Sequence, residues 1–421
     1  MLKTLQILPG VTLRHFREER FKQGCMSIQF VRPMCREEAS MNALLPAVLL
    51  RGTQDHPDLR TITERLDDLY GASVSTMVRR IGDYQTVGLY SGFISDRYAL
   101  PGDRVLGPMV EFLRELLLRP VLEDGVFRED YVNSEVKNLI STIEAERNDK
   151  RAYCAAQMLS NMCRADSYGI PRLGHKEDVA AITAGKLWDH YRRILRESPV
   201  AVFYVGAAPA EEVAGMVKGV FEGLDRAPMA LEPQTPFHDA GGSDGVEEME
   251  ITQGKLSMGF VTPITNRSPR FAAMQLLNAI FGAGMTSKLF MVVREKMSLC
   301  YAIGSGYYGS KGIMTVSAGI DCDKEPLVRG EVLRQLALCQ RGEITPAELE
   351  AAREAVLSSL RGVHDSPGAI EGFYATGALS GLNRDPQRYM EEIRAVKLED
   401  VVEAAKTVKL HTTYFLKGVG V

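Results

Sequence analysis

Histidine is the residue type best suited to bind a catalytic metal, but the histidine spacing offers no helix-borne site. The chain has seven histidines, which stand at positions 15, 56, 175, 190, 238, 364 and 411. Two imidazoles can bind one zinc ion from a single helix when they are four residues apart, and no pair has this separation. The sequence contains neither an HExxH nor an HxxEH motif, so that only a zinc site assembled from dispersed residues stays open.

Two glycine motifs match catalytic patterns but stand in the wrong context. Residues 304–309, GSGYYG, satisfy the GxGxxG spacing, yet the segment that follows alternates like a strand. A dinucleotide fingerprint must open a helix, so this stretch predicts a turn between antiparallel strands. Residues 241–245, GGSDG, satisfy GxSxG but lie in a polar stretch typical of a linker, whereas a nucleophile elbow joins a strand to a helix.

The composition is that of an ordinary globular chain. Its 421 residues include 50 basic and 54 acidic side chains, and the net charge of −4 argues against a nucleic-acid or anionic-membrane binder. No run approaches the roughly 18 consecutive apolar residues of a membrane helix. The seven cysteines are scattered without a CxxC pair, which favours free thiols in a reducing compartment. We therefore expect a cytoplasmic protein with no nucleic-acid and no membrane partner.

The elements that would position a site follow one plan twice. A break at 226–246, rich in proline, glycine and small polar residues, predicts a linker between half-domains at 1–225 and 247–421. In each half, an alternating strand is followed by two helical segments, two more strands, a long charged helix and a final apolar strand. This repetition predicts an α+β fold of two homologous half-domains, each a mixed, mainly antiparallel sheet packed by helices, together forming a clamshell.

Residues 281–305, FGAGMTSKLFMVVREKMSLCYAIGS, carry the most specific signal in the chain. They resemble the stretch FGxGxxSxLFxxxREKxGLxY in the C-terminal half-domain of the insulinase/pitrilysin superfamily, in the bacterial branch that is similar to the mitochondrial processing peptidase. Ser298 replaces the usual glycine of this stretch. The resemblance implies that Arg294 and Tyr301 lie near a peptide substrate, where guanidinium and phenol groups suit carbonyl oxygens.

The first half departs from the same superfamily at the positions that carry its chemistry. Active members place HxxEH before a (K/R)GT turn, as inverted zincins do. The segment MNALLPAVLLRGT (41–53) keeps that turn, but Ala43, Pro46 and Ala47 stand at the positions of His, Glu and His. None of these three side chains can bind a metal ion or accept a proton.

By resemblance, the remaining metal ligand is missing as well. The superfamily carries a glutamate-x6-glutamate pair on the helix after a leucine-rich stretch ending in proline, which looks like ELLLRP (115–120) in this chain. The pair falls on Glu135 and Thr142, so that the accessory acid is kept while a hydroxyl group stands at the ligand position. We therefore expect no metal in this chain, and zinc only in a partner subunit.

These features lead to one main hypothesis and two alternatives. The chain is expected to be the zinc-free, non-catalytic subunit of a bacterial heterodimeric metallopeptidase of the processing-peptidase type. It would help a homologous HxxEH-bearing subunit bind and enclose a peptide substrate. The first alternative is a non-enzymatic scaffold protein of the same fold, which would not need Arg294 and Tyr301. The second is a stand-alone zinc peptidase with a displaced site.

Overall fold

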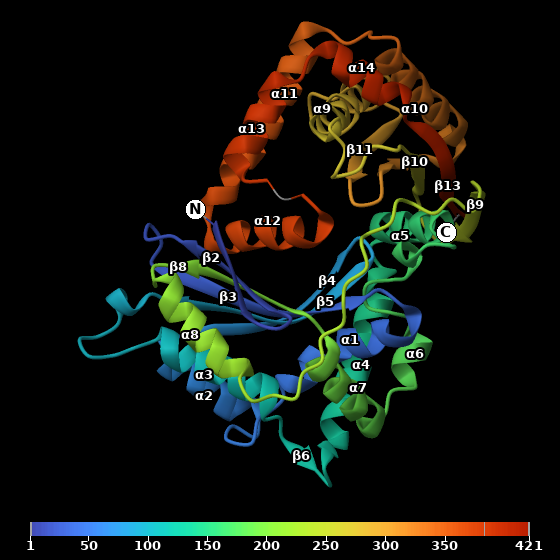
Figure 1. The fold of residues 1–421 in the computed structure, drawn as a ribbon. Helices are drawn as coiled ribbons and strands as arrows, with labels where there is room; N and C mark the ends of the chain where they lie inside the picture. The colour runs from blue at the N-terminus through green and yellow to red at the C-terminus, as the bar shows by residue number, and fades with distance from the viewer. Residues whose placement is uncertain (1, 383, 420–421) are drawn as a thin grey trace. The chain divides into compact units, whose positions relative to one another are not determined.

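The computed structural model describes residues 2–382 and 384–419, which form two compact units (Figure 1). Unit 1 comprises Met1–Glu144, Ile170–Pro233 and His364–Ala375. Unit 2 comprises Ala145–Gly169, Gln234–Val363 and Thr376–Val421. Each unit thus takes one segment from the other half of the sequence. The half-domain boundaries at 1–225 and 247–421 stay a prediction, and the compact units cross them twice.

Unit 1 is built on a six-stranded sheet with the order β1-β2-β8-β3-β5-β4. The strands are β1 (Leu2–Leu8), β2 (Val11–Arg17), β3 (Gln23–Pro33), β4 (Ser73–Ile81), β5 (Tyr84–Ile94) and β8 (Val200–Gly206). Strands β2 and β8 run parallel, while the other neighbouring strands run antiparallel. The central strand β3 is buried from Gly24 to Arg32, because elements cover both faces of the sheet.

Helices cover one face of this sheet, as Figure 1 shows for α3 and α8. They are α1 (Arg36–Leu49), α2 (Leu59–Asp68), α3 (Leu106–Leu118), α4 (Glu129–Glu146), α6 (Lys176–Ala180), α7 (Ala184–Glu197) and α8 (Ala210–Phe221). Helix α3 shows why they pack: Met109, Leu113 and Leu116 recur at helical spacing and are completely buried. Each such leucine stabilises the fold by about 1.5–3 kcal/mol.

The other face of the unit 1 sheet is covered by a segment from late in the sequence, the first part of α12 (Pro367–Ser380). Glu371 on this helix is 1% exposed and accepts hydrogen bonds from Ser27 Oγ at 2.7 Å and Gln29 Nε2 at 3.0 Å. The Arg79 guanidinium donates to both oxygens of the Glu371 carboxylate, at 3.1 and 2.8 Å. The buried carboxylate is fully bonded, so it fixes the first part of α12 on the sheet.

Unit 2 is built on a five-stranded sheet with the order β11-β12-β10-β13-β9. The strands are β9 (Asp244–Met249), β10 (Gly254–Val261), β11 (Cys300–Tyr308), β12 (Ile313–Ile320) and β13 (Lys409–Gly418). The helices of unit 2 are α5 (Lys150–Met162), α9 (Phe271–Phe281), α10 (Glu325–Gln340), α11 (Pro346–Arg361), α13 (Pro386–Ala395) and α14 (Leu398–Lys406), with a π-helical segment η3 (Leu289–Lys296). Helix α5 packs on β10 and β13.

The two sheets share one strand order, which confirms the predicted α+β fold of duplicated, mainly antiparallel sheets packed by helices. Strands β4, β5, β3, β8 and β2 of unit 1 correspond in order and direction to β11, β12, β10, β13 and β9 of unit 2. The GxGxxG stretch was predicted to form the turn itself, but residues 304–308 lie in β11 and pair with β12, and only Gly309 belongs to the turn of this antiparallel hairpin. Across the described part of the chain, no helix combines the length and apolar character needed to span a membrane.

Candidate functional site

Four of the positions that resemble the zinc site of the superfamily converge in unit 1. Ala43 and Ala47 lie one turn apart on α1, and Glu135 and Thr142 lie on α4. All four line one cavity of about 340 Å³. The edge strand β4 closes this cavity with Thr76 and Val78, and the other lining residues are Leu44, Asn138, Leu139, Arg172 and Leu173.

The structure places Pro46 on another side of α1, where it lines a smaller apolar cavity with Phe30 and Leu117. A proline inside a helix removes one backbone donor and costs about 3 kcal/mol when the helix is exposed. Here α1 continues past Pro46, and Leu50 N donates to Pro46 O at 3.2 Å. The burial of the Pro46 ring among apolar side chains stabilises the helix against the lost hydrogen bond.

The one carboxylate of the cavity is already paired. Glu135 Oε1 lies 3.3 Å from Nη1 of Arg51, the arginine of the turn that follows α1, and Glu135 Oε2 accepts from Asn138 Nδ2 at 3.2 Å. The Arg51 guanidinium also lies over the Tyr131 ring, 5.0 Å from its centroid. A guanidinium cation therefore lies beside the one acid of this cavity.

The donor set of this cavity does not fit zinc. A catalytic zinc ion needs three protein ligands, usually histidine and carboxylate side chains. Ala43 and Ala47 have no donor atom, and the Thr142 hydroxyl donates to Asn138 O at 2.9 Å within its own helix. Among residues 2–382 and 384–419, no group of three or more His, Cys, Asp or Glu side chains could hold a metal ion. The residues of this cavity therefore cannot hold a catalytic zinc ion.

A buried polar network fixes α1 next to this cavity. His190 is 2% exposed, and its Nδ1 atom receives a hydrogen bond from Arg193 Nη2 at 2.9 Å. Because arginine can only donate, Nδ1 is the acceptor, and Nε2–H donates to Asn42 Oδ1 at 2.7 Å. Asn42 Nδ2 in turn donates a hydrogen bond to Gln85 Oε1 at 2.8 Å. The network requires a neutral imidazole, and burial lowers the pKa of His190 to about 4.

Protonation of His190 is expected to make the fold less stable in mild acid. The pKa of His190 is lower in the folded state than the ordinary value near 6.5, so the unfolded chain takes up the proton first. The contribution of His190 is complete above pH 6.5, falls as the pH decreases towards 4, and amounts to about 3 kcal/mol at most. Urea midpoints measured between pH 7.5 and 4.5 should therefore fall more steeply for the native chain than for His190→Gln. Parallel slopes for the two proteins would contradict this prediction.

The two positions predicted to contact a peptide lie together in unit 2. Arg294 is on η3 and Tyr301 is on the edge strand β11, and both line a cavity of about 360 Å³. Its other lining residues are Gln253, Glu295, Ser298, Leu299, Cys300, Gly319, Ile320 and Asp321. The Tyr301 side chain is 49% exposed, and the Arg294 guanidinium lies over the Phe290 ring at 4.6 Å from the centroid. Both side chains thus present donors to the solvent at one opening.

The turn between η3 and β11 sets the positions of these side chains. Ser298 adopts a left-handed conformation, with φ of 51°, where the superfamily has glycine. The Ser298 and Leu299 amides donate to Arg294 O at 3.2 Å and Val293 O at 3.0 Å and so end the helical segment. Burial raises the pKa of the neighbouring Cys300 thiol to about 11, against the opposing effect of Arg294. This thiol is protonated at neutral pH and offers no nucleophile.

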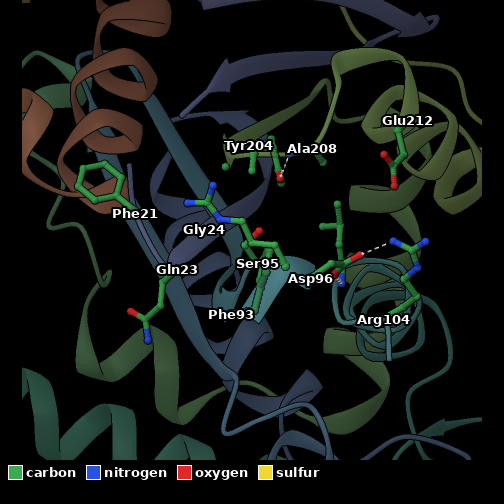
Figure 2. A pocket seen from close by; sticks show the side chains of 14 residues that line it. Phe21, Gln23, Gly24, Phe93, Ser95, Asp96, Arg104, Tyr204, Ala208 and Glu212 are labelled. Atoms are coloured by element: carbon green, nitrogen blue, oxygen red, sulfur yellow. Dashed lines mark hydrogen bonds and ion pairs between the residues drawn. The ribbon is translucent and has the colours of Figure 1, made fainter. Parts of the chain in front are cut away.

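A third cavity, of about 330 Å³, lies in unit 1 where β8 leads into α8 (Figure 2). Sequence reasoning did not predict it. The Tyr204 hydroxyl accepts from Ala208 N at 3.0 Å, and Asp96 caps α3 by accepting from Val105 N and Leu106 N at 2.9 Å. Asp96 also lies 3.5 Å from Arg104. These hydrogen bonds hold the turn between β8 and α8 and cap the N-terminus of α3.

The chain resembles known proteins over its whole length. Residues 181–356 match the family model described as Peptidase M16 inactive domain. The chain is 27% identical over 409 residues to the "Probable inactive metalloprotease YmfF" of Bacillus subtilis, covering 97% of this chain and 96% of the relative. It is 23% identical over 357 residues to the "Uncharacterized zinc protease YmxG" of the same organism, covering 82% and 85%.

Solved structures with the same fold agree with this relationship. A conserved protein from Enterococcus faecalis V583 superposes with a TM-score of 0.91 at 26% identity and covers 99% of both chains. A peptidase M16 inactive domain from Pseudomonas fluorescens superposes with a TM-score of 0.83 at 17% identity, covering 99% of this chain and 98% of that one. The second likeness shows the fold alone.

Fold and site together define a class of protein. The chain has the fold of the M16-type structures, with one strand order in both units. Within the part of the chain that the structure describes, the cavity lined by Ala43 and Ala47 has no set of metal ligands. The match of residues 181–356 to the M16 inactive-domain model and the likeness to the Bacillus subtilis relative confirm the resemblance of residues 281–305 to the M16 (insulinase/pitrilysin) group.

Proposed function

We propose that this chain is the zinc-free subunit of a heterodimeric M16-type peptidase, in which it binds peptide for a homologous subunit that bears HxxEH and zinc. Arg294 and Tyr301 would donate hydrogen bonds to the carbonyl groups of an extended peptide. The complex would be cytoplasmic, and the two half-domains would enclose the substrate as a clamshell.

One observation carries this proposal: the chain has lost the metal-binding side chains but keeps exposed donors at the predicted substrate position. Arg294 and Tyr301 open from one cavity, whereas the cavity with Ala43 and Ala47 holds a single, already paired carboxylate. A chain without any role in peptide binding has no need of the exposed donors at Arg294 and Tyr301. The name of the Bacillus subtilis relative, an inactive metalloprotease, supports the loss of the metal-binding side chains.

Mixing experiments test the proposal. The chain is purified with and without an HxxEH-bearing homologue from the same genome, and cleavage of an internally quenched peptide pool is measured with and without a chelator. We expect the mixture to cleave faster than the homologue alone. Arg294→Ala and Tyr301→Phe should each lower kcat/KM of the mixture by about tenfold or more, since each removes a hydrogen bond to a desolvated carbonyl group.

Matched variants control for general effects on the fold. Tyr308→Phe removes a hydroxyl group from the same strand, where Tyr308 is 40% exposed. Arg341→Ala removes an exposed arginine that is paired with Glu343. Both should leave kcat/KM unchanged. If Arg294→Ala and Tyr301→Phe are equally silent while the complex forms, the scaffold alternative is correct. Chelator-sensitive cleavage by the purified chain alone would overturn both.

A further inference from the structure

A β-bulge determines where the Tyr301 side chain points. The pairing of β11 with β12 runs in regular antiparallel register from Ala302 to Tyr308, and it shifts between Cys300 and Ala302. Tyr301 is the extra residue at this shift. A bulge leaves its extra residue unpaired and turns the side chain away from the regular alternation. The backbone conformation at the bulge therefore sets the direction in which the Tyr301 side chain points.

The neighbouring strand has a glycine where the ring passes. Gly319 on β12 pairs with Ala302, and a Cβ atom built on Gly319 would lie 2.4 Å from Cζ and from the hydroxyl oxygen of Tyr301. No side chain fits in that space. The ring thus lies across β12 at Gly319 and reaches the third strand of the sheet, β10.

On β10 the Tyr301 ring meets Lys255, the register partner of Gly319. The Lys255 ammonium donates a hydrogen bond to the Tyr301 hydroxyl and lies 4.8 Å from the centroid of the ring. An ammonium group has donors only, so the phenol oxygen is the acceptor. The hydroxyl proton of Tyr301 then remains available for another acceptor, and the positive charge of Lys255 on the oxygen strengthens that donation.

We infer that Lys255 is a positioning residue, which together with the bulge and Gly319 holds Tyr301 as an oriented hydrogen-bond donor. Its acceptor would be a carbonyl oxygen, the group that a peptide backbone presents. This inference rests on the proposed function for the identity of the ligand, but the arrangement of Lys255 and Tyr301 can be tested without it.

The first test measures the environment of the Tyr301 ring directly. Tyr301 is replaced site-specifically by 3-fluorotyrosine in the full chain, and its ¹⁹F resonance is recorded. Lys255→Met keeps most of the apolar stem but removes the donor, so the resonance should shift and sharpen as the ring loses its fixed position. Lys417→Met is the matched control. Lys417 lies on β13 and is paired with Glu248 of β9. It follows Leu416, the register partner of Lys255, so its side chain lies on the opposite face of the sheet from Lys255.

The second test measures function in the mixture with the HxxEH-bearing homologue and the internally quenched peptide pool. Lys255→Met should lower kcat/KM by about tenfold. Lys255→Arg should keep at least half of the native kcat/KM, because a guanidinium group also donates hydrogen bonds and stacks on a ring. Lys417→Met should have no effect on kcat/KM. An unchanged ¹⁹F resonance overturns the inference, as does an unchanged kcat/KM where Tyr301→Phe lowers it. If the mixture shows no added cleavage, the proposed function fails and the resonance alone decides whether Lys255 orients Tyr301.

Discussion

Replacing Lys311 by methionine is expected to lower the free energy of unfolding of unit 2 by about 3–5 kcal/mol, because the substitution leaves a buried carboxylate without its cation. The Lys311 and Asp166 side chains are 0% and 3% exposed, and Nζ lies 3.0 Å from Oδ1. Exposed ion pairs contribute little, whereas a buried charge that loses its partner keeps its full desolvation cost.

The surroundings of this pair explain why the effect should be large. Lys311 stands in the turn between β11 and β12 and also donates to Thr235 O at 3.2 Å. Asp166 accepts from the backbone amides of Tyr168 at 2.8 Å and His238 at 3.0 Å. The pair therefore links the β11–β12 hairpin, which carries Tyr301, to two irregular segments. One segment follows α5 and the other precedes β9. Irregular segments have few other contacts that fix them.

Hydrogen exchange in increasing urea, followed by mass spectrometry, resolves unit 2 from unit 1. Lys311→Met should raise exchange in the peptides of unit 2, with unit 1 as the internal reference. Lys324→Met, which removes a partly exposed pair with Asp321, should change stability by less than about 0.5 kcal/mol. In the double variant Lys311→Met/Asp166→Asn the unpaired charge is gone, so about 2 kcal/mol should be recovered. A loss below about 1 kcal/mol for Lys311→Met would show that the carboxylate is solvated.

Periodicity in the sequence was sufficient to predict the main elements of both units. Each half was expected to have an alternating strand followed by two helical segments and two more strands, and unit 1 has β3 followed by α1, α2, β4 and β5 in this order. Such elements bury one continuous apolar face, and that face is visible in the sequence as spacing. The parallel edge strand β9 was not expected, because its residues 244–249, DGVEEM, include three carboxylates and alternate between exposed and half-buried positions.

The candidate sites could be predicted only as far as single positions. Counting from the RGT turn identified Ala43 and Ala47, and the structure brings both to one cavity with Glu135. The ion pair of Glu135 with Arg51 and the contact of Tyr301 with Lys255 join residues that are 84 and 46 positions apart. No local pattern encodes such pairs, since they depend on how α4 crosses α1 and how β10 is placed in the sheet. The role of Gly319 can be recognised only once the structure shows that the Tyr301 ring lies across it.

The cavity beside α1 should accept zinc when its ligands are supplied. Ala43 and Ala47 are one turn apart on the same face of α1, and Thr142 lines the same cavity from α4. In the triple variant Ala43→His/Ala47→His/Thr142→Glu, two imidazoles and a carboxylate would therefore converge on one point. Alanine leaves room for the imidazoles, because no larger side chain fills the space. We expect the purified variant to bind about one zinc ion per chain, whereas the native chain binds none at these positions.

Two further variants make this expectation specific. The double variant Ala43→His/Ala47→His has only two ligands and should lose its zinc at chelator concentrations that the triple variant withstands. Adding Arg51→Met to the triple variant should tighten zinc binding, because it removes the guanidinium that lies 3.3 Å from Glu135 and repels a divalent cation. Zinc content is measured by elemental analysis after dialysis against graded chelator. If the triple variant folds but binds zinc no better than the double variant, then α1 and α4 have moved apart along with the loss of the ligands, and the cavity no longer has the geometry of a metal site.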